Sequence, residues 1–186
     1  MKTFKSMIIV KHPKKLVWQT MRDRLTDMVP FLDDVAFIEQ VDRRESGNGS
    51  VQLTNFWRAD IKIPDAIRSI LHASEVSWLD RAEWSEIRDK CEWQIEPRFF
   101  TDHIRCAGTT SFEPAVGGRG TRITFEGKLD IALNNIPGVP RFMHGTATKA
   151  IESLVTTLIP KNFHKLTAAL SNLLDNERNR PLKRSH

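Results

Sequence analysis

The chain has 186 residues, of which 40% are hydrophobic and 27% are charged, and its formal net charge is +5. These values are those of an ordinary globular domain that is long enough to bury a sizeable core. No apolar run approaches the roughly 18 residues that a membrane-spanning helix needs. The longest run near the N-terminus, MIIV, is too short for a signal peptide, so we expect a cytoplasmic protein.

The N-terminal part of the chain predicts a strand, a helical segment and a hairpin. The strand covers residues 3–11, and apolar residues near helical spacing follow Pro13 until Pro30 breaks the helix. The residues SGNGS at 46–50 form a strong turn signal between two strand patterns.

Six strands and a long helix complete the predicted order. The strands lie at 35–45, 51–60, 75–86, 91–98, 102–113 and 121–133. The helical pattern runs from Ile151 to Leu174, and Pro160 should kink it. The order predicts an α+β fold in which a curved antiparallel sheet of about seven strands wraps around the C-terminal helix. Such a sheet commonly leaves a cavity against the helix, and such cavities hold small apolar ligands.

The connector between the third and fourth strands is unusually apolar. Hairpin connections are normally a few polar residues, but residues 61–73 include Ile61, Ile63, Ile67, Ile70 and Leu71. A helix of about eight residues from Pro64 is too short to be stable alone, so it must pack onto something apolar. We interpret the connector as a mobile lid over a cavity; an ordinary packed crossover helix is the alternative.

Strand alternation predicts which side chains line the cavity. Three polar residues, Glu39, Asn55 and Asp80, fall among apolar neighbours on the predicted inner faces. A buried carboxylate needs a partner or a raised pKa. One interpretation is that these residues orient a ligand; another is that bulges or the opposite alternation place them in water. The predicted ligand contacts are Asn55, Trp57, Ile67, Ile70, Trp78, Asp80, Trp84, Trp93, Phe112 and Phe125, although tryptophans at such positions are also typical of a core.

Cysteine and histidine positions predict neither a disulfide nor a metal site. Cys91 should lie opposite Thr109 or Thr110, and Cys106 near Ile95, which separates the two thiols by about 13 Å along the strands. The six histidines lie on separate predicted elements, and no metal-ligand spacing occurs. No phosphate loop or nucleophile motif is present. We therefore expect no metal and no cofactor.

Basic clusters at 11–15 and 178–186 have two interpretations. They belong either to a solvated surface with a frayed tail or to a surface that is transiently attracted to anionic membranes. No nucleic-acid-binding motif is present, so no nucleic acid partner is expected.

The element order resembles the helix-grip fold of the START-like superfamily (SRPBCC), which includes polyketide cyclases and lipid-transfer proteins. Residues 56–86, FWRADIKIPDAIRSILHASEVSWLDRAEWSE, resemble the strand–helix–strand segment of PRELI/MSF1-type phospholipid-transfer domains. There too a tryptophan-bearing strand is followed by a proline, a short Ile/Leu helix and a strand. The resemblance implies a hydrophobic-ligand cavity with a lid at 61–73, in a START-like ligand-binding domain that we assign to 1–175. The residues themselves predict a basic disordered tail over 176–186, in which the chain departs from the PRELI/MSF1 type.

The sequence favours a protein that binds a hydrophobic small molecule or lipid between the sheet and the C-terminal helix, without covalent chemistry. Two alternatives stay open. The first is a small cyclase- or dehydratase-like enzyme that uses Glu39 or Asp80 as general acid or base. The second is a protein-interaction module whose isoleucine-rich connector docks a partner.

Overall fold

The computed structural model describes residues 1–47, 49–62, 75–98, 103–131 and 144–179; over 144–160 it describes only the backbone, Gly145 and Lys149 excepted. Within these ranges the chain forms one seven-stranded antiparallel sheet with the order β1-β7-β6-β5-β4-β3-β2. The elements are β1 (Lys2–Val10), α1 (Lys14–Asp23), the 3-10 helix η1 (Leu25–Phe31), β2 (Val35–Ser46), β3 (Ser50–Ala59), β4 (Ser77–Ser85), β5 (Lys90–Pro97), β6 (Ile104–Ala115), the short 3-10 helix η2 (Val116–Gly118), β7 (Gly120–Ile131) and α3 (His144–Arg178).

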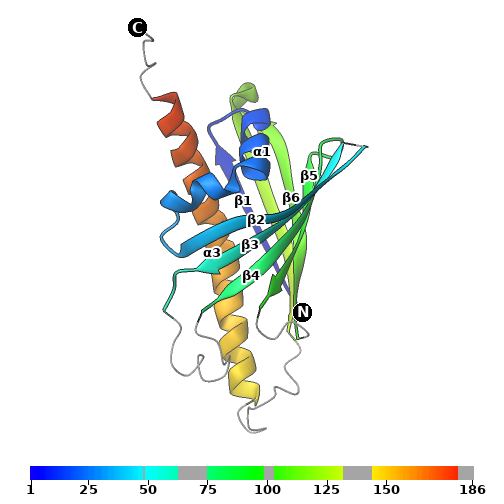
Figure 1. Cartoon of the computed structure of the whole chain (residues 1–186), viewed down its shortest axis with the longest axis vertical. Helices are drawn as coiled ribbons and strands as arrows, with labels where there is room; N and C mark the ends of the chain where they lie inside the picture. Colours follow the sequence, from blue (N-terminus) through cyan, green and yellow to red (C-terminus); the bar gives the residue numbers. More distant parts are fainter. Residues whose placement is uncertain (48, 63–74, 99–102, 132–143, 180–186) are drawn as a thin grey trace.

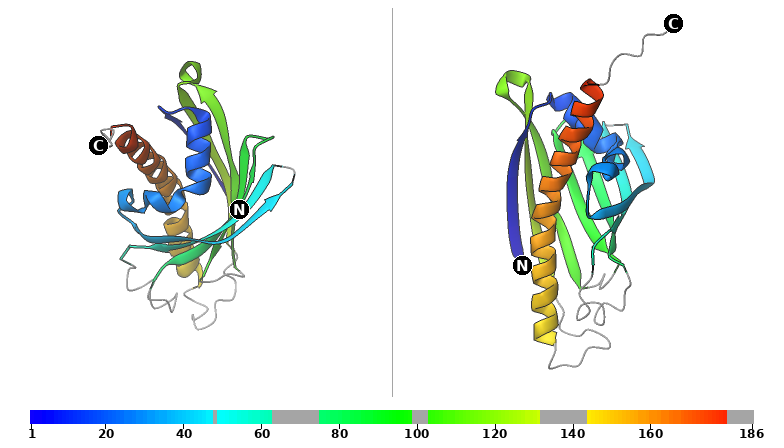
Figure 2. Two further views of the ribbon diagram at one scale, coloured as in Figure 1. Left: turned by 45° about the horizontal axis from the view of Figure 1, so that its top comes forward. Right: turned by 90° about the vertical axis from the view of Figure 1, so that its left-hand side faces the viewer.

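The sheet is curved and α3 lies along its concave face (Figures 1 and 2). The α1–η1 segment lies on the same side of the sheet, toward the end at which α3 finishes (Figure 1). Buried apolar side chains from α1, α3 and the inner face of the sheet form one continuous core. The α+β architecture that the sequence predicts is therefore confirmed.

Turn chemistry explains how the first hairpin closes. Gly49 adopts a φ of 77°, which an L-residue with a side chain rarely adopts, and its N–H donates to the carbonyl oxygen of Ser46 at 3.2 Å. The predicted turn at 46–50 thus joins β2 and β3 as expected.

The helices differ from the prediction in two details. Arg24 has a φ of −130°, so α1 ends at Asp23 and Pro30 lies inside η1 instead of ending a longer α-helix. Helix α3 continues through Pro160, and the kink expected there stays a prediction. It ends at Arg178, so residues 176–178, predicted as disordered tail, belong to the helix; residues 180–186 lie outside the described ranges.

Strand β2 departs from the predicted alternation. Register shifts occur between Val35 and Phe37 and again between Gln40 and Asp42, and each shift moves the following side chains to the opposite face. After the first shift Ile38 is consequently buried, whereas its neighbours Phe37 and Glu39 are exposed. The prediction that Glu39 points into the interior is wrong for this reason.

Candidate functional site

A cavity of about 210 Å³ lies between the concave face of the sheet, the α1–η1 segment and α3. Strands β3 to β7 supply most of the wall, and α3 supplies Asn162, Phe163 and Leu166. Most of the lining side chains are apolar or aromatic, which is typical of a site for a small organic ligand. The predicted contacts that line it are Asn55, Trp57, Trp78, Asp80, Trp84, Trp93 and Phe125.

Gly108 and Gly127 make room for Trp93, which lines the cavity. Phe4, Gly127, Gly108 and Trp93 lie opposite one another across β1, β7, β6 and β5. A Cβ atom on Gly108 would overlap the Trp93 ring and a backbone carbonyl oxygen of β7, and one on Gly127 would overlap the Phe4 ring. The absence of both side chains lets the indole of Trp93 lie close to the sheet backbone.

A column of stacked rings then connects the sheet to α3. The ring centroids of Trp93 and Phe125 are 4.7 Å apart with an interplanar angle of 11°. Phe125 and Phe163 stack in the same manner, at 4.6 Å and 10°. Stacked pairs of this kind contribute about 0.5–1.5 kcal/mol beyond their area burial. The column fixes the position of α3 over one end of the cavity.

The polar part of the wall centres on Asp80. Asp80 lies opposite Asn55 across β3 and β4, and Trp57 is two residues further along β3, so the three side chains share the inner face. Burial raises the pKa of Asp80 to about 6, and interactions with the Asn55 amide and the Trp57 indole oppose that rise. Asp80 keeps partial exposure because its side chain faces the cavity.

Trp57 carries an unsatisfied donor in this part of the wall. Its ring is 9% exposed and stacks on Trp78 with a centroid distance of 5.6 Å. Although the indole interacts with Asp80, its Nε1–H completes no hydrogen bond within the described residues. A buried N–H without a partner carries a free-energy penalty.

An ion pair closes the side of the cavity between β2 and α3. Lys165 Nζ lies 2.7 Å from Asp34 Oδ2, and both side chains are largely buried. The carbonyl oxygen of Asp34 also accepts a hydrogen bond from the backbone N–H of Asp60 at 2.8 Å. This bond joins the residue that precedes β2 to the residue that follows β3. The sequence offered no signal for this pair, because the two residues are 131 positions apart.

One predicted ligand contact, Phe112, is not among the lining residues, and two others lie where the structure gives no description. Phe112 is 1% exposed and packs in the core against Trp18 and Trp84, with centroid distances of 5.0 and 5.7 Å. It belongs to the core, where Trp18 of α1 packs against it, and it is not among the described residues that line the cavity. Ile67 and Ile70, with most of the predicted lid, lie outside the described residues.

The two cysteines line the cavity as free thiols, and the predicted register is confirmed. Cys91 lies opposite Thr110 and Cys106 opposite Ile95. Burial, together with the Asp80 carboxylate, raises the pKa of Cys91 well above its usual value, and burial raises the pKa of Cys106 to about 12. Both thiols therefore stay protonated at neutral pH and are poor nucleophiles.

Two other kinds of feature do not occur in the described part of the chain. No group of three or more His, Cys, Asp or Glu side chains there could hold a metal ion. Its helices include none that is both long and apolar enough to cross a membrane.

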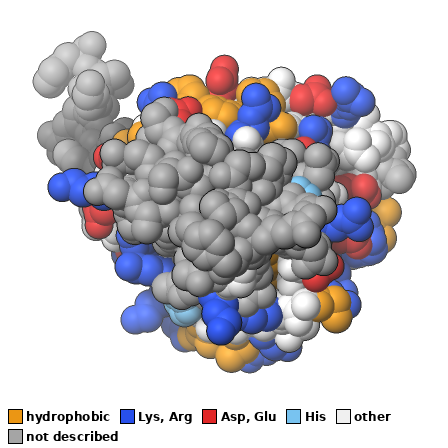
Figure 3. Space-filling model, turned by 90° about the horizontal axis from the view of Figure 1, so that it is seen from below, with side chains coloured by type: hydrophobic (Ala, Val, Ile, Leu, Met, Phe, Trp, Pro, Cys, Tyr) orange, Lys and Arg blue, Asp and Glu red, His pale blue; other side chains and the backbone are white. Residues whose placement is uncertain are grey.

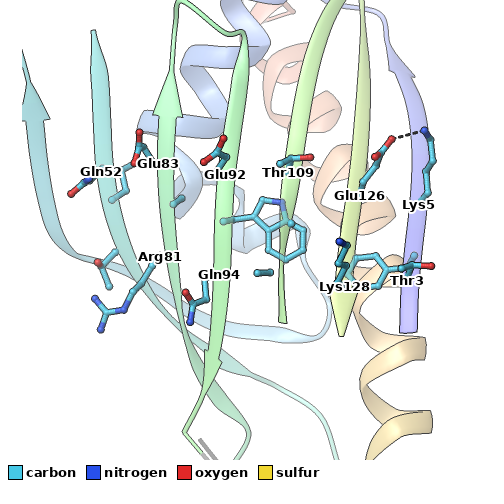
Figure 4. A pocket seen from close by; sticks show the side chains of 18 of the residues that line it. Thr3, Lys5, Gln52, Arg81, Glu83, Glu92, Gln94, Thr109, Glu126 and Lys128 are labelled. Carbon is cyan, nitrogen blue, oxygen red and sulfur yellow. Dashed lines mark ion pairs between the residues drawn. The ribbon is translucent and has the colours of Figure 1, made fainter. Parts of the chain in front are cut away.

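A larger hollow of about 1100 Å³ lies on the outer face of the sheet and is lined mainly by polar and charged side chains (Figure 4). Most of these charges are engaged with one another. Ion pairs on this face include Lys5–Glu126, Arg81–Glu96, Arg44–Asp42, Arg122–Glu113, and Arg88 with Glu83 and Glu92. A charge-balanced face of this kind is typical of a solvated sheet surface, so the inner cavity is the better candidate site.

The end of the molecule where β1 begins carries charged side chains of both signs around its periphery (Figure 3). Lys and Arg side chains predominate along the left and lower edge of this view, and Asp and Glu side chains lie mainly along its upper and right edges. The attraction to an anionic membrane surface therefore stays a prediction.

Comparisons with known proteins identify the fold. No family model matches the chain, and no curated protein matches it. TTHA0849 from Thermus thermophilus is 21% identical with a TM-score of 0.65, over 95% of this chain and 99% of that chain. The ZhuI aromatase/cyclase from Streptomyces sp. R1128 is 13% identical with a TM-score of 0.64, over 100% and 99%. Ara h 8.0201 is 15% identical with a TM-score of 0.57, over 94% and 99%.

These similarities show that the chain has the helix-grip fold, a curved antiparallel sheet closed around a C-terminal helix. They concern the fold alone. The local resemblance to PRELI/MSF1-type domains stays a prediction.

Proposed function

We propose that this chain is a START-like protein that binds a small hydrophobic molecule in the cavity between the sheet and α3. The observation that carries the proposal is the wall itself, in which four tryptophans and two phenylalanines surround a few polar groups. A cavity of about 210 Å³ is larger than the roughly 150 Å³ apolar cavity that accommodates benzene. It suits a ligand of one or two rings.

Tryptophan fluorescence tests this proposal, because four of the five tryptophans line the cavity. Naphthalene is a suitable neutral two-ring probe. We expect one binding site with a Kd of roughly 10–100 µM. This range follows from a binding free energy of about 0.6 kcal/mol for each carbon atom of naphthalene.

A matched pair of variants locates the binding site. Ala82 is buried and lines the cavity, so Ala82→Leu fills part of the volume and should weaken naphthalene binding at least tenfold. Ala107→Leu adds the same atoms to the exposed outer face and should leave binding unchanged. Equal binding by both variants would place the naphthalene elsewhere and reject the proposal.

The predicted lid at 61–73 adds a finer proposal, that this connector gates the cavity. Replacing Ile67 and Ile70 with Asp should then slow or weaken ligand loading. If the connector instead docks a protein partner, the double variant should load naphthalene normally.

Asp80 supports a second candidate function, general acid–base catalysis. Its pKa of about 6 lies near neutral pH and its carboxyl group faces the cavity, which is what a general acid or base requires. One structurally similar protein is an aromatase/cyclase, which agrees with this candidate. Under it, the wild-type protein should convert a compound in the small-molecule extract of its host, whereas Asp80→Asn should bind that compound without converting it.

A further inference from the structure

The charged side chains among the described residues that line the cavity are acidic, although the whole chain has a net charge of +5. Among the described lining residues, Asp34 and Asp80 are charged and no Lys, Arg or His is present. Lys165 neutralises Asp34 at 2.7 Å. None of the described residues forms an ion pair with Asp80, so a single carboxyl group sets the sign of the charge on the described part of the wall.

The neighbours of Asp80 favour its ionised form but supply no positive charge. The Asn55 amide and the Trp57 indole both interact with the carboxyl group in the sense that stabilises the carboxylate. From β5, Ile95 lies opposite Asp80 and Cys91 carries a neutral thiol. The carboxylate therefore has donors around it and lacks a counter-ion within the described wall.

The rest of the wall near Asp80 suits a cation. Trp78 precedes Asp80 by two residues on β4 and therefore shares its face, and Trp78 stacks on Trp57 with an interplanar angle of 16°. Trp84 and Trp93 also line the cavity. The face of an indole ring attracts an ammonium group, and this attraction strengthens when water is excluded.

We propose that the cavity selects a small organic cation, an amine or quaternary ammonium carried on one or two rings, whose charge is received by Asp80 beside the stacked indoles of Trp57 and Trp78. The inference rests on the proposed function and names its ligand class. A ligand that placed a carboxylate or phosphate in the cavity would bring a second negative charge beside Asp80, and like charges repel strongly where water is excluded. Fatty acids and phospholipid headgroups are accordingly disfavoured inside this wall.

Three probes of matched shape test the inference by isothermal titration calorimetry at pH 7.5: 2-phenylethylamine, 2-phenylethanol and 3-phenylpropionate. These carry an ammonium, a hydroxyl and a carboxylate on the same two-carbon arm. We expect the wild-type protein to bind the ammonium at least tenfold more tightly than the alcohol, and the carboxylate more weakly than either.

Two variants remove one negative charge each. Asp80→Asn should lower the affinity for 2-phenylethylamine at least tenfold and leave that for 2-phenylethanol within about threefold. Glu39→Gln removes the same charge from an exposed position on β2 and should leave all three affinities unchanged.

The outcomes separate this inference from the proposed function. Binding of the alcohol without preference for the ammonium, or a preference that survives Asp80→Asn, would overturn the inference and leave hydrophobic binding intact. Failure of all three probes and of naphthalene would overturn both. The relative affinities of the wild-type protein for the three probes test the inference even if the Asp80→Asn protein does not fold.

Discussion

Replacing Asp80 with Asn should stabilise the empty protein at neutral pH. The pKa of Asp80 rises from 3.8 to about 6 on folding, chiefly because burial disfavours the carboxylate. One pKa unit corresponds to 1.36 kcal/mol, so a shift of about two units is worth at most about 3 kcal/mol. The Asp80 side chain keeps partial exposure, which weakens the effect of burial, and we therefore expect about 1–3 kcal/mol.

The sign of the pH dependence follows from linkage. Because the folded pKa lies above the unfolded pKa, the folded state holds the proton more tightly between about pH 4 and pH 6. The contribution of Asp80 to stability therefore falls as the pH rises through that window and stays constant above it. An Asn at this position has no proton to lose and retains a carbonyl oxygen for the donors of Asn55 and Trp57.

Urea unfolding followed by tryptophan fluorescence at pH 4, 5, 6 and 7.5 measures the effect. The difference in unfolding free energy between Asp80→Asn and the wild type should increase by about 1–3 kcal/mol in favour of the variant between pH 4 and pH 7.5. Glu39→Gln, which alters an exposed carboxylate, should show no comparable increase. A constant difference at all four pH values, or a variant that loses stability as the pH rises, would refute the account of Asp80 as an uncompensated buried acid.

Three further substitutions test the packing around the cavity, each by urea unfolding. Gly108→Ala should lower the free energy of unfolding by about 3 kcal/mol or more, because the new methyl group overlaps a backbone carbonyl oxygen. Gly145→Ala is the control, because its new methyl group meets nothing within 4 Å. Equal stability of the two variants would contradict the reasoning. Phe163→Ala should lower the free energy of unfolding by about 3–5 kcal/mol, because it removes the last ring of the stacked column and opens a void. A decrease below 1 kcal/mol would show that the column does not hold α3. Lys165→Met should lower the unfolding free energy by about 1–2 kcal/mol, because it removes the ammonium group that lies 2.7 Å from a largely buried carboxylate, whereas Lys161→Met, at an exposed position of the same helix, should be neutral.

Strand alternation predicted the inner faces of β3 to β7 correctly, because those strands pair in continuous register. Asn55, Asp80 and Trp93 face inward at the positions that a period of two gives. The same rule failed for β2, where Glu39 faces water. Local patterns in the sequence did not indicate the two bulges that shift its register.

Features that depend on distant pairing could not be predicted. The hydrophobic pattern of α3 indicated that Phe163 would be buried, but its stacking on Phe125 depends on how the helix is placed over the sheet. The role of Gly108 depends on Trp93 of the neighbouring strand, because only the folded sheet shows which ring occupies the space above a glycine. Asp80 was predicted as an inward carboxylate, and its lack of a cationic partner among the described residues became evident only from the assembled wall.

Native mass spectrometry of the protein purified from its own host tests the central claim most directly. The account predicts a complex of one chain with one small molecule that organic extraction removes. The complex should be present in Ala107→Leu and depleted in Ala82→Leu, which differ in whether the added side chain enters the cavity. A wild-type spectrum that contains only the mass of the bare chain, or a ligand that Ala82→Leu retains in full, would contradict binding in this cavity.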